Sequence, residues 1–226
     1  MRKFVVFLLV AVLLTSCGCS SAAEEVVEIG EATQQAAPTV AEETAPEPEP
    51  TPIPIPEPVV YTGSGDDVIE ISPPDLYYVF SITGNESEDH FAVKSYDSAG
   101  EYGELLVNTT DPYSGITLDD SFDVKMLEIT ASGDWTIEVL SLRGMNVVSG
   151  GETYNGTGDT VLLVNNPGMT ATVLGNNSAD YFAVWSYGEY RDLVVSTTEP
   201  YDGTVMLEDP FMFVVTAVGD WSITLN

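Results

Sequence analysis

The sequence predicts an all-β protein with two tandem, small antiparallel β-sandwich repeats of the jelly-roll type. The first observation is that Gly133-Asp134-Trp135-Thr136-Ile137 returns as Gly219-Asp220-Trp221-Ser222-Ile223. The second is a series of further matches: Tyr61–Asp66 with Tyr154–Asp159, Gly84-Asn85 with Gly175-Asn176, Phe91–Val93 with Phe182–Val184, Pro112-Tyr113 with Pro200-Tyr201, and Gly115 with Gly203. The third is a run of short segments rich in Val, Ile, Tyr, Phe and Thr, separated by turn residues and without an amphipathic helical pattern.

The matches indicate a duplicated module. Their spacing falls from 93 residues at Tyr61 and Tyr154 to 86 at Trp135 and Trp221, so the second copy has lost a few loop residues. Each copy spans about 75–80 residues, which favours two small domains over a solenoid, whose units repeat every ~20–50 residues. A single sandwich that exchanges strands between the copies is an alternative that the sequence leaves open.

The first repeat is predicted over residues 60–140 and the second over 154–226, with 141–153 as a short connection. The strands expected in the first repeat are Val68–Ile71, Leu76–Ile82, Phe91–Tyr96, Leu105–Asn108, Ile116–Leu118, Val124–Thr130 and Trp135–Leu140. Each Gly-Asp pair before a tryptophan predicts a two-residue hairpin turn, with Gly133 and Gly219 at positive φ. Trp135 and Trp221 then point into the two cores.

The N-terminus has the pattern of an export signal over residues 1–16. Arg2 and Lys3 precede an unbroken apolar run from Phe4 to Leu14, which would extend roughly 16 Å as a helix, about half of a bilayer core. This length is typical of a signal peptide and too short for a transmembrane helix.

The four residues that follow this run, Leu14-Thr15-Ser16-Cys17, resemble the lipobox of bacterial lipoproteins. The resemblance implies that the chain is cut before Cys17 and that Cys17 carries the diacylglyceryl and palmitate-type acyl groups. Two acyl chains anchor a protein stably to a bilayer. The resemblance therefore places the protein on the extracytoplasmic face of a cell membrane.

Residues 17–59 are predicted to be a lipidated N-terminus followed by an acidic, proline-rich, disordered linker. Proline alternates with other residues from Pro46 to Pro58, a pattern that excludes helix and favours extended polyproline II. We expect a spacer that holds the repeats away from the membrane. A proline-rich ligand for the aromatic groove of a partner is the alternative.

Charge excludes one class of partner. The chain has 6 Lys and Arg against 36 Asp and Glu, a formal net charge of −30. Nucleic acids are bound mainly by clustered Lys and Arg, so we expect no nucleic-acid partner. Neither repeat contains a cysteine, and the cores must hold without disulfides.

The residues give little support to catalysis. His90 is the only histidine, and Tyr181 takes its place in the second copy. A Ser-His-Asp triad needs an imidazole that an acid orients, and the repeated module does not supply one. We expect no enzyme, although a hydrolase that uses two close carboxylates stays open because only their separation decides it.

Calcium is the cofactor that the acidic loops suggest, and the alternative is no cofactor at all. Calcium binds oxygen ligands from carboxylates and carbonyls. The candidate ligands recur at matching places in the two copies: Asp66 and Asp67 with Asp159, and Asp120 with Asp209. Aspartate also makes turns and carries solubilising charge, which is the competing explanation.

Aromatic residues are the candidate ligand-binding groups. Tyr113 and Tyr201 follow proline in predicted loops, and Trp185 is out of phase with Phe182 and Val184, which predicts an exposed ring. The repeats resemble all-β accessory modules of secreted bacterial proteins in pattern and in their Gly-Asp-Trp ending. We expect a non-catalytic binding or scaffolding lipoprotein with a polysaccharide or surface-protein ligand. A structural surface spacer is the alternative.

Overall fold

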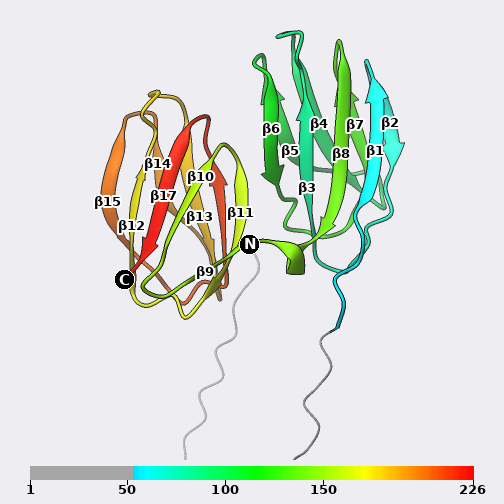
Figure 1. Cartoon of the computed structure of the whole chain (residues 1–226). Coiled ribbons are helices and arrows are strands. Elements are labelled where there is room, and N and C mark those ends of the chain that lie inside the picture. Colours follow the sequence, from blue (N-terminus) through cyan, green and yellow to red (C-terminus); the bar gives the residue numbers. More distant parts are fainter. Residues whose placement is uncertain (1–52) are drawn as a thin grey trace, which may run out of the picture. The chain divides into compact units, whose positions relative to one another are not determined.

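The computed structural model describes residues 53–226, in which every regular element is a strand apart from one short 3-10 helix (Figure 1). The strands of the first repeat are β1 (Val59–Ser64), β2 (Asp67–Glu70), β3 (Tyr78–Gly84), β4 (Phe91–Asp97), β5 (Tyr102–Thr109), β6 (Tyr113–Thr117), β7 (Val124–Thr130) and β8 (Asp134–Ser141). Within residues 53–226, no helix is long and apolar enough to cross a bilayer.

The second repeat follows after the 3-10 helix η1 (Leu142–Gly144). Its strands are β9 (Val147–Ser149), β10 (Thr153–Thr157), β11 (Thr160–Asn165), β12 (Thr170–Gly175), β13 (Phe182–Tyr187), β14 (Arg191–Thr197), β15 (Tyr201–Met206), β16 (Met212–Thr216) and β17 (Asp220–Leu225). The all-β prediction is confirmed for the described residues.

The strands form four sheets, and the two repeats have the same strand order. In the first repeat the orders are β1-β8-β3-β6 and β2-β7-β4-β5. In the second they are β10-β17-β12-β15 and β14-β13-β16-β11-β9. Apart from β9, each strand of one repeat has its counterpart at the same place in the other. No sheet in the described chain mixes strands β1–β8 with strands β10–β17, so the strand-exchanged alternative is wrong.

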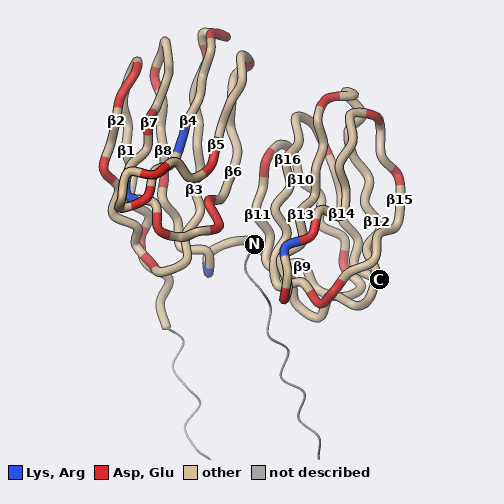
Figure 2. The backbone as a smooth tube through the Cα atoms, turned by 180° about the vertical axis from the view of Figure 1, so that it is seen from behind, with Lys and Arg blue, Asp and Glu red and all other residues tan. Residues whose placement is uncertain are grey.

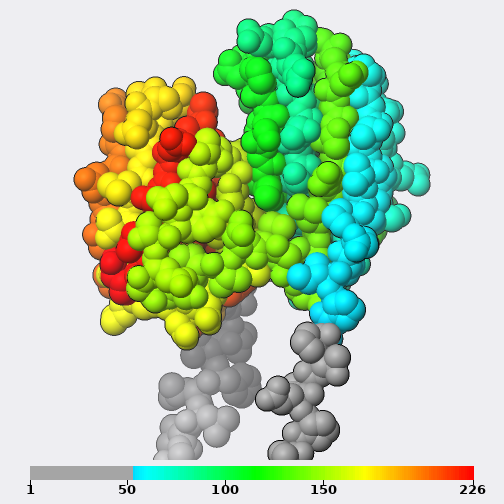
Figure 3. All heavy atoms as spheres, viewed as in Figure 1, coloured from blue at the N-terminus to red at the C-terminus, as the bar shows by residue number. Residues whose placement is uncertain are grey.

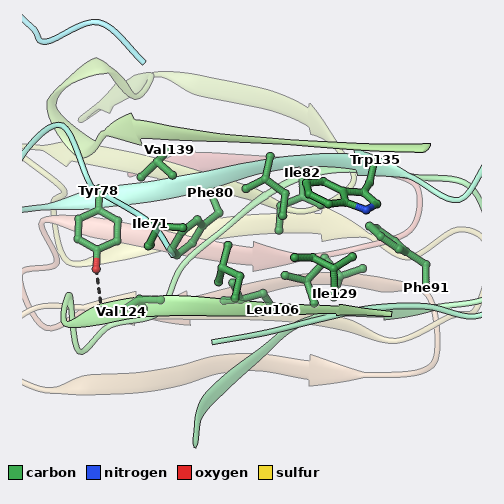
Figure 4. Packing of buried hydrophobic residues seen from close by; sticks show 14 residues of the cluster. Ile71, Tyr78, Phe80, Ile82, Phe91, Leu106, Val124, Ile129, Trp135 and Val139 are labelled. Carbon is green, nitrogen blue, oxygen red and sulfur yellow. Dashed lines mark hydrogen bonds between the residues drawn. The ribbon is translucent and has the colours of Figure 1, made fainter. Parts of the chain in front are cut away.

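The core of each repeat lies between its two sheets. In the first repeat, buried side chains of β3 and β8 meet those of β4, β5 and β7 in one cluster (Figure 4). The burial of β8 alternates along the strand, with Trp135, Ile137 and Val139 buried and the residues between them partly exposed. This alternation is the period of a strand with one covered face.

Several of the recurring residues pack an aromatic ring against a glycine. A Cβ atom on Gly63 would lie 2.2 Å from the ring of Trp135, and one on Gly156 would lie 2.3 Å from the ring of Trp221. The pairs Gly84 with Phe91, Gly175 with Phe182, Gly115 with Tyr113 and Gly203 with Tyr201 are packed in the same way. Both copies of the module therefore keep a glycine at each position where an aromatic ring fills the space that a side chain would need.

The predicted hairpin turns at the Gly-Asp pairs are wrong. β7 and β8 belong to different sheets, so the chain crosses between sheets at Gly133 instead of folding back within one. Gly133 and Gly219 are not at positive φ, whereas Gly65 and Gly158 are, at 76° and 69°. Trp135 and Trp221 do face the cores as predicted, with exposed fractions of 3% and 4%.

Two boundaries also differ from prediction. The first repeat has eight strands instead of the seven predicted, because β1 begins at Val59, the last residue of the predicted linker, and the second repeat has nine strands with β9 included. The predicted connection 141–153 contains η1 and β9, and β9 pairs in parallel with β11. Val147–Ser149 therefore adds an edge strand to a sheet of the second repeat. The predicted signal peptide, the lipidation site Cys17 and most of the predicted linker lie outside the described residues.

Candidate functional site

The two repeats contact each other through β6 of the first and the β10–β11 turn of the second. The backbone N–H of Ile116 donates to the carbonyl oxygen of Asp159 at 2.9 Å. The hydroxyl of Tyr113 donates to the Oδ2 atom of Asp159 at 2.7 Å. An apolar cluster drawn from both repeats lies beside these bonds, with Val79, Leu118, Leu142, Val161 and Met212 buried in it. The repeats therefore share an interface with a core of its own.

A cavity of about 470 Å³ opens beside this contact, and we call it the inter-repeat cleft. Strand β5, the segment from Asp111 to Leu118 and Asp120 line it from the first repeat. The second repeat adds four groups of residues: Gly158 with Asp159, Tyr181 with Trp185 and Tyr187, Arg191, and Val214 with Thr216–Val218. Aromatic rings and carboxylates thus face the same space from both repeats.

Arg191 is the basic residue among those that line the cleft. Its guanidinium lies 4.1 Å from the ring centroid of Trp185 and 5.6 Å from that of Tyr187. Its Nη1 atom lies 2.9 Å from Asp120 Oδ2 and 4.0 Å from Glu104 Oε1. Stacking of this kind fixes the plane of an arginine, because its flat cation is attracted to the face of the rings. Arg191 therefore links the cleft walls of the two repeats.

The carboxyl of Asp159 is half-buried, and each of its oxygens accepts a hydrogen bond. Its Oδ1 atom accepts from the backbone N–H of Ala217 at 2.9 Å and its Oδ2 atom accepts from Tyr113. Burial raises the pKa of Asp159 above its ordinary value, and the hydrogen bonds from Tyr113 and Ala217 oppose that rise. Burial and the nearby Asp159 carboxylate likewise raise the pKa of Tyr113. Burial also raises the pKa of Glu104 at the rim, against the attraction of Arg191.

The raised pKa of Asp159 makes the stability of the protein depend on pH. A carboxyl with a higher pKa in the folded state contributes stability that is complete below its unfolded pKa, about 3.8, and is lost as pH rises through the folded value. We therefore expect Asp159→Asn, which does not titrate, to become more stable relative to the wild type as pH rises from 3.5. Urea unfolding from pH 3.5 to 7 measures this difference.

The control for this prediction is Asp66→Asn. Asp66 is the counterpart of Asp159 in the first repeat, and its Oδ1 atom accepts the equivalent bond from the N–H of Ala131, but its side chain is exposed. A pH dependence of equal size in both variants would contradict the role that we assign to burial at the interface.

The structure brings two of the three predicted ligand residues into one cleft. Tyr113 and Trp185 both line it, and Trp185 is partly exposed beside Arg191. Tyr201 lies elsewhere, in the second repeat's own surface groove. The prediction that Tyr113 and Tyr201 lie in loops is wrong, because they begin β6 and β15. Their half-buried rings pack against the two cores. Gly115 and Gly203 leave room for these rings.

The five predicted calcium ligands are not brought together. Asp66 and Asp159 bond to backbone N–H groups of a neighbouring loop, and Asp67 bonds to the N–H of Val68. Asp120 is paired with Arg191, and Asp209 is an exposed residue with φ of 48°. Within residues 53–226, no three His, Cys, Asp or Glu side chains lie close enough to hold a metal ion.

Sequence reasoning missed Arg191 and Tyr187 as site residues. His90, the other candidate, is exposed; its Nε2 atom lies 3.1 Å from Oδ1 of Asn108, which lines the cleft, but His90 itself does not line it. A signal for Arg191 was present, because it is the basic residue nearest in sequence to the unmatched Trp185. Its partner Asp120 comes from the other repeat and 71 positions away. Because the two residues are so far apart in sequence, no local pattern indicates that they form a pair.

No family model matches this chain, and no curated protein matches it either.

Proposed function

We propose that the protein is a membrane-anchored extracytoplasmic lipoprotein whose repeats form a non-catalytic binding module. The observation that supports a binding role is the convergence of Tyr113, Trp185 and Arg191, from two repeats, on one cleft. Binding sites in proteins are typically concave, rich in aromatic side chains and equipped with a few placed polar groups. The resemblance of the residues up to Cys17 to a lipobox supports the proposed location at the membrane.

In this proposal each repeat is a jelly-roll β-sandwich. The two strand orders of the first repeat, β1-β8-β3-β6 and β2-β7-β4-β5, support it because two sheets with these orders enclose one core. A rigid scaffold of this kind suits a module that presents a preformed cleft.

The charge of the cleft restricts its ligand. Glu104, Asp111, Asp120 and Asp159 line it, and Arg191 is already paired with two carboxylates. The basic residues of the described chain are Lys94, Lys125, Arg143 and Arg191, and Figure 2 shows acidic residues spread over both repeats. An anionic ligand would be repelled. A neutral polysaccharide, whose sugar rings can stack on Trp185, is the ligand that we test first, and a surface protein is the second.

The expected result for the cleft is that Trp185→Ala weakens ligand binding at least about tenfold, because aromatic anchors dominate binding sites. The measurement is retention of the full chain on neutral cell-wall polysaccharides, followed by titration of the polymer that retains it. Lys94→Ala is the matched control, since Lys94 occupies the position of Trp185 in the first repeat and pairs with Glu128 outside the cleft. Equal loss in both variants would argue against the cleft.

The expected result for the anchor is that Cys17→Ser abolishes lipid labelling of the protein and releases it from membranes. Only the thiol of Cys17 can accept the diacylglyceryl group in the lipoprotein mechanism that the lipobox implies. Metabolic labelling with a palmitate analogue, followed by membrane fractionation, measures both effects. Cys19→Ser is the control, and continued labelling of Cys17→Ser would remove the anchor assignment.

A further inference from the structure

Each repeat carries an open groove on its β1-β8-β3-β6 or equivalent sheet. The first repeat's groove adjoins the inter-repeat cleft, because Pro112, Tyr113 and Ser114 line both. Figure 3 shows the outer face of this sheet of the first repeat in cyan and green. The groove of the first repeat has a volume of about 760 Å³ and is lined by residues of β3, β6 and β8 with the loops beside them. The groove of the second repeat has a volume of about 970 Å³ and is lined by β10, β12, β15 and β17.

The two grooves are built from matching residues. The pairs that line both are Gly84 with Gly175, Pro112 with Pro200, Tyr113 with Tyr201, Asp134 with Asp220, Trp135 with Trp221, and Thr136 with Ser222. These are the most regular matches of the duplicated module. The two grooves therefore share a common set of lining positions, to which β10 adds further residues in the second repeat only.

Most recurring polar residues have a role in holding the fold. Asn85 and Asn176 donate to the carbonyl oxygens of Asp111 and Glu199. Thr109 and Thr197 accept from the backbone N–H groups two residues further on. Such bonds fix turns and strand ends. The recurrence of these residues needs no ligand to explain it.

The aspartate of each groove is different. Asp134 is exposed, and its carboxylate has no hydrogen-bond or ion-pair partner within the part of the chain that the structure describes. Asp220 is also exposed and accepts one bond, from the hydroxyl of Thr157. Replacing these residues would leave the cores untouched. A shared ligand outside the protein accounts for an acid that recurs without a common structural role.

The groove chemistry selects the class of ligand. No Lys, Arg or His lines either groove. The polar groups are carboxylates, of Glu86 and Asp134 in one and of Asp202 and Asp220 in the other, together with several hydroxyls. Carboxylates accept hydrogen bonds only, and hydroxyls both donate and accept. A half-buried tyrosine adds a flat apolar surface to each groove. Hydroxyl groups on a neutral sugar chain match this set, whereas anions do not.

We propose that the paired grooves are two equivalent sites for a neutral oligosaccharide, in which Asp134 and Asp220 accept hydrogen bonds from sugar hydroxyls. Two equal sites on one chain would hold a long polymer more tightly than a short one, because the second contact becomes intramolecular. This proposal does not depend on a ligand in the inter-repeat cleft, and the two can fail separately.

The test is isothermal titration of the full chain with cellohexaose, chitohexaose and mannohexaose. The expected result is two sites per chain for at least one of them, one site in Asp134→Ala, one in Asp220→Ala and none in the double variant. Trp185→Ala should keep both sites. The matched control is Glu138→Ala, because Glu138 lies on the same strand and the same face as Asp134 but does not line the groove.

Three outcomes would overturn the proposal. One is the absence of binding to all three sugars. Another is a single site that is lost in Trp185→Ala and kept in the aspartate double variant, which would assign sugar binding to the cleft. The last is binding of hexalysine at the same two sites with loss of all binding at high salt, which would show that the grooves attract cations through charge alone.

Discussion

Replacing Trp221 with alanine is expected to lower the free energy of unfolding by about 3–5 kcal/mol, the range for deletion of a large buried aromatic side chain. The indole of Trp221 is 4% exposed, and its Nε1 atom donates to the carbonyl oxygen of Gly158 at 2.9 Å. The variant would lose this bond and leave a cavity in the second core. Urea unfolding of the wild type and the variant at neutral pH measures the difference.

Gly156, which packs against the indole ring of Trp221, allows a second and more specific test of this packing. Gly156→Ala would place a Cβ atom 2.3 Å from Trp221, and we expect this overpacking to cost about 1–3 kcal/mol. The cost should disappear in the Trp221→Ala background, because the atoms that clash are then absent. Gly219→Ala is the control, since its Cβ would meet nothing closer than 3.7 Å. If Gly156→Ala lowers the free energy of unfolding by the same amount in the Trp221→Ala background, the steric clash with the indole ring is not its cause.

Replacing Val161 with aspartate is expected to destabilise the protein by at least about 3 kcal/mol, because an unpaired charge would be buried in the apolar interface between the repeats. Val161 is 1% exposed and packs in the cluster that both repeats form. The same change should separate the unfolding of the two repeats into distinct transitions. Differential scanning calorimetry and urea unfolding followed by fluorescence measure these two effects.

The repeat itself supplies the control for this interface variant. Val68 is the counterpart of Val161 on β2 and is 62% exposed. Val68→Asp should therefore change the free energy of unfolding by no more than about 0.5 kcal/mol, as is usual for surface substitutions. A loss in Val68→Asp as large as that in Val161→Asp would mean that intrinsic strand preference, and not the interface, controls the effect.

The duplication and the all-β class were readable from the sequence because they rest on local patterns. Alternation at Trp135, Ile137 and Val139 reports which face of a strand is covered. Recurring glycines and aromatics report packing that both copies share. Sequence patterns did not indicate β1, because Gly63, Ser64 and Gly65 at its end are typical of a turn, although Gly63 lies in the strand and makes room for Trp135.

The candidate site was only partly predictable. Tyr113 and Trp185 were identified from their place in the repeat, and the structure puts both at the inter-repeat cleft. Arg191 and Asp120 form their ion pair across 71 positions and between repeats. No local pattern encodes such a pair. The strand roles of Tyr113 and Tyr201 were also hidden, because a proline before a tyrosine is equally typical of a loop.

The sequence by itself determined that one β module occurs twice and that Trp135 and Trp221 face the two cores. Only the tertiary structure decided which outer surfaces meet. Val161 is buried in the apolar cluster between the repeats and the partly buried Val214 packs against that cluster, whereas the counterpart of Val161, Val68, is exposed and that of Val214 is the charged Glu128. The physical reason is that a residue's burial between domains depends on what packs against it. Two copies with the same local pattern therefore differ wherever one copy contacts the other.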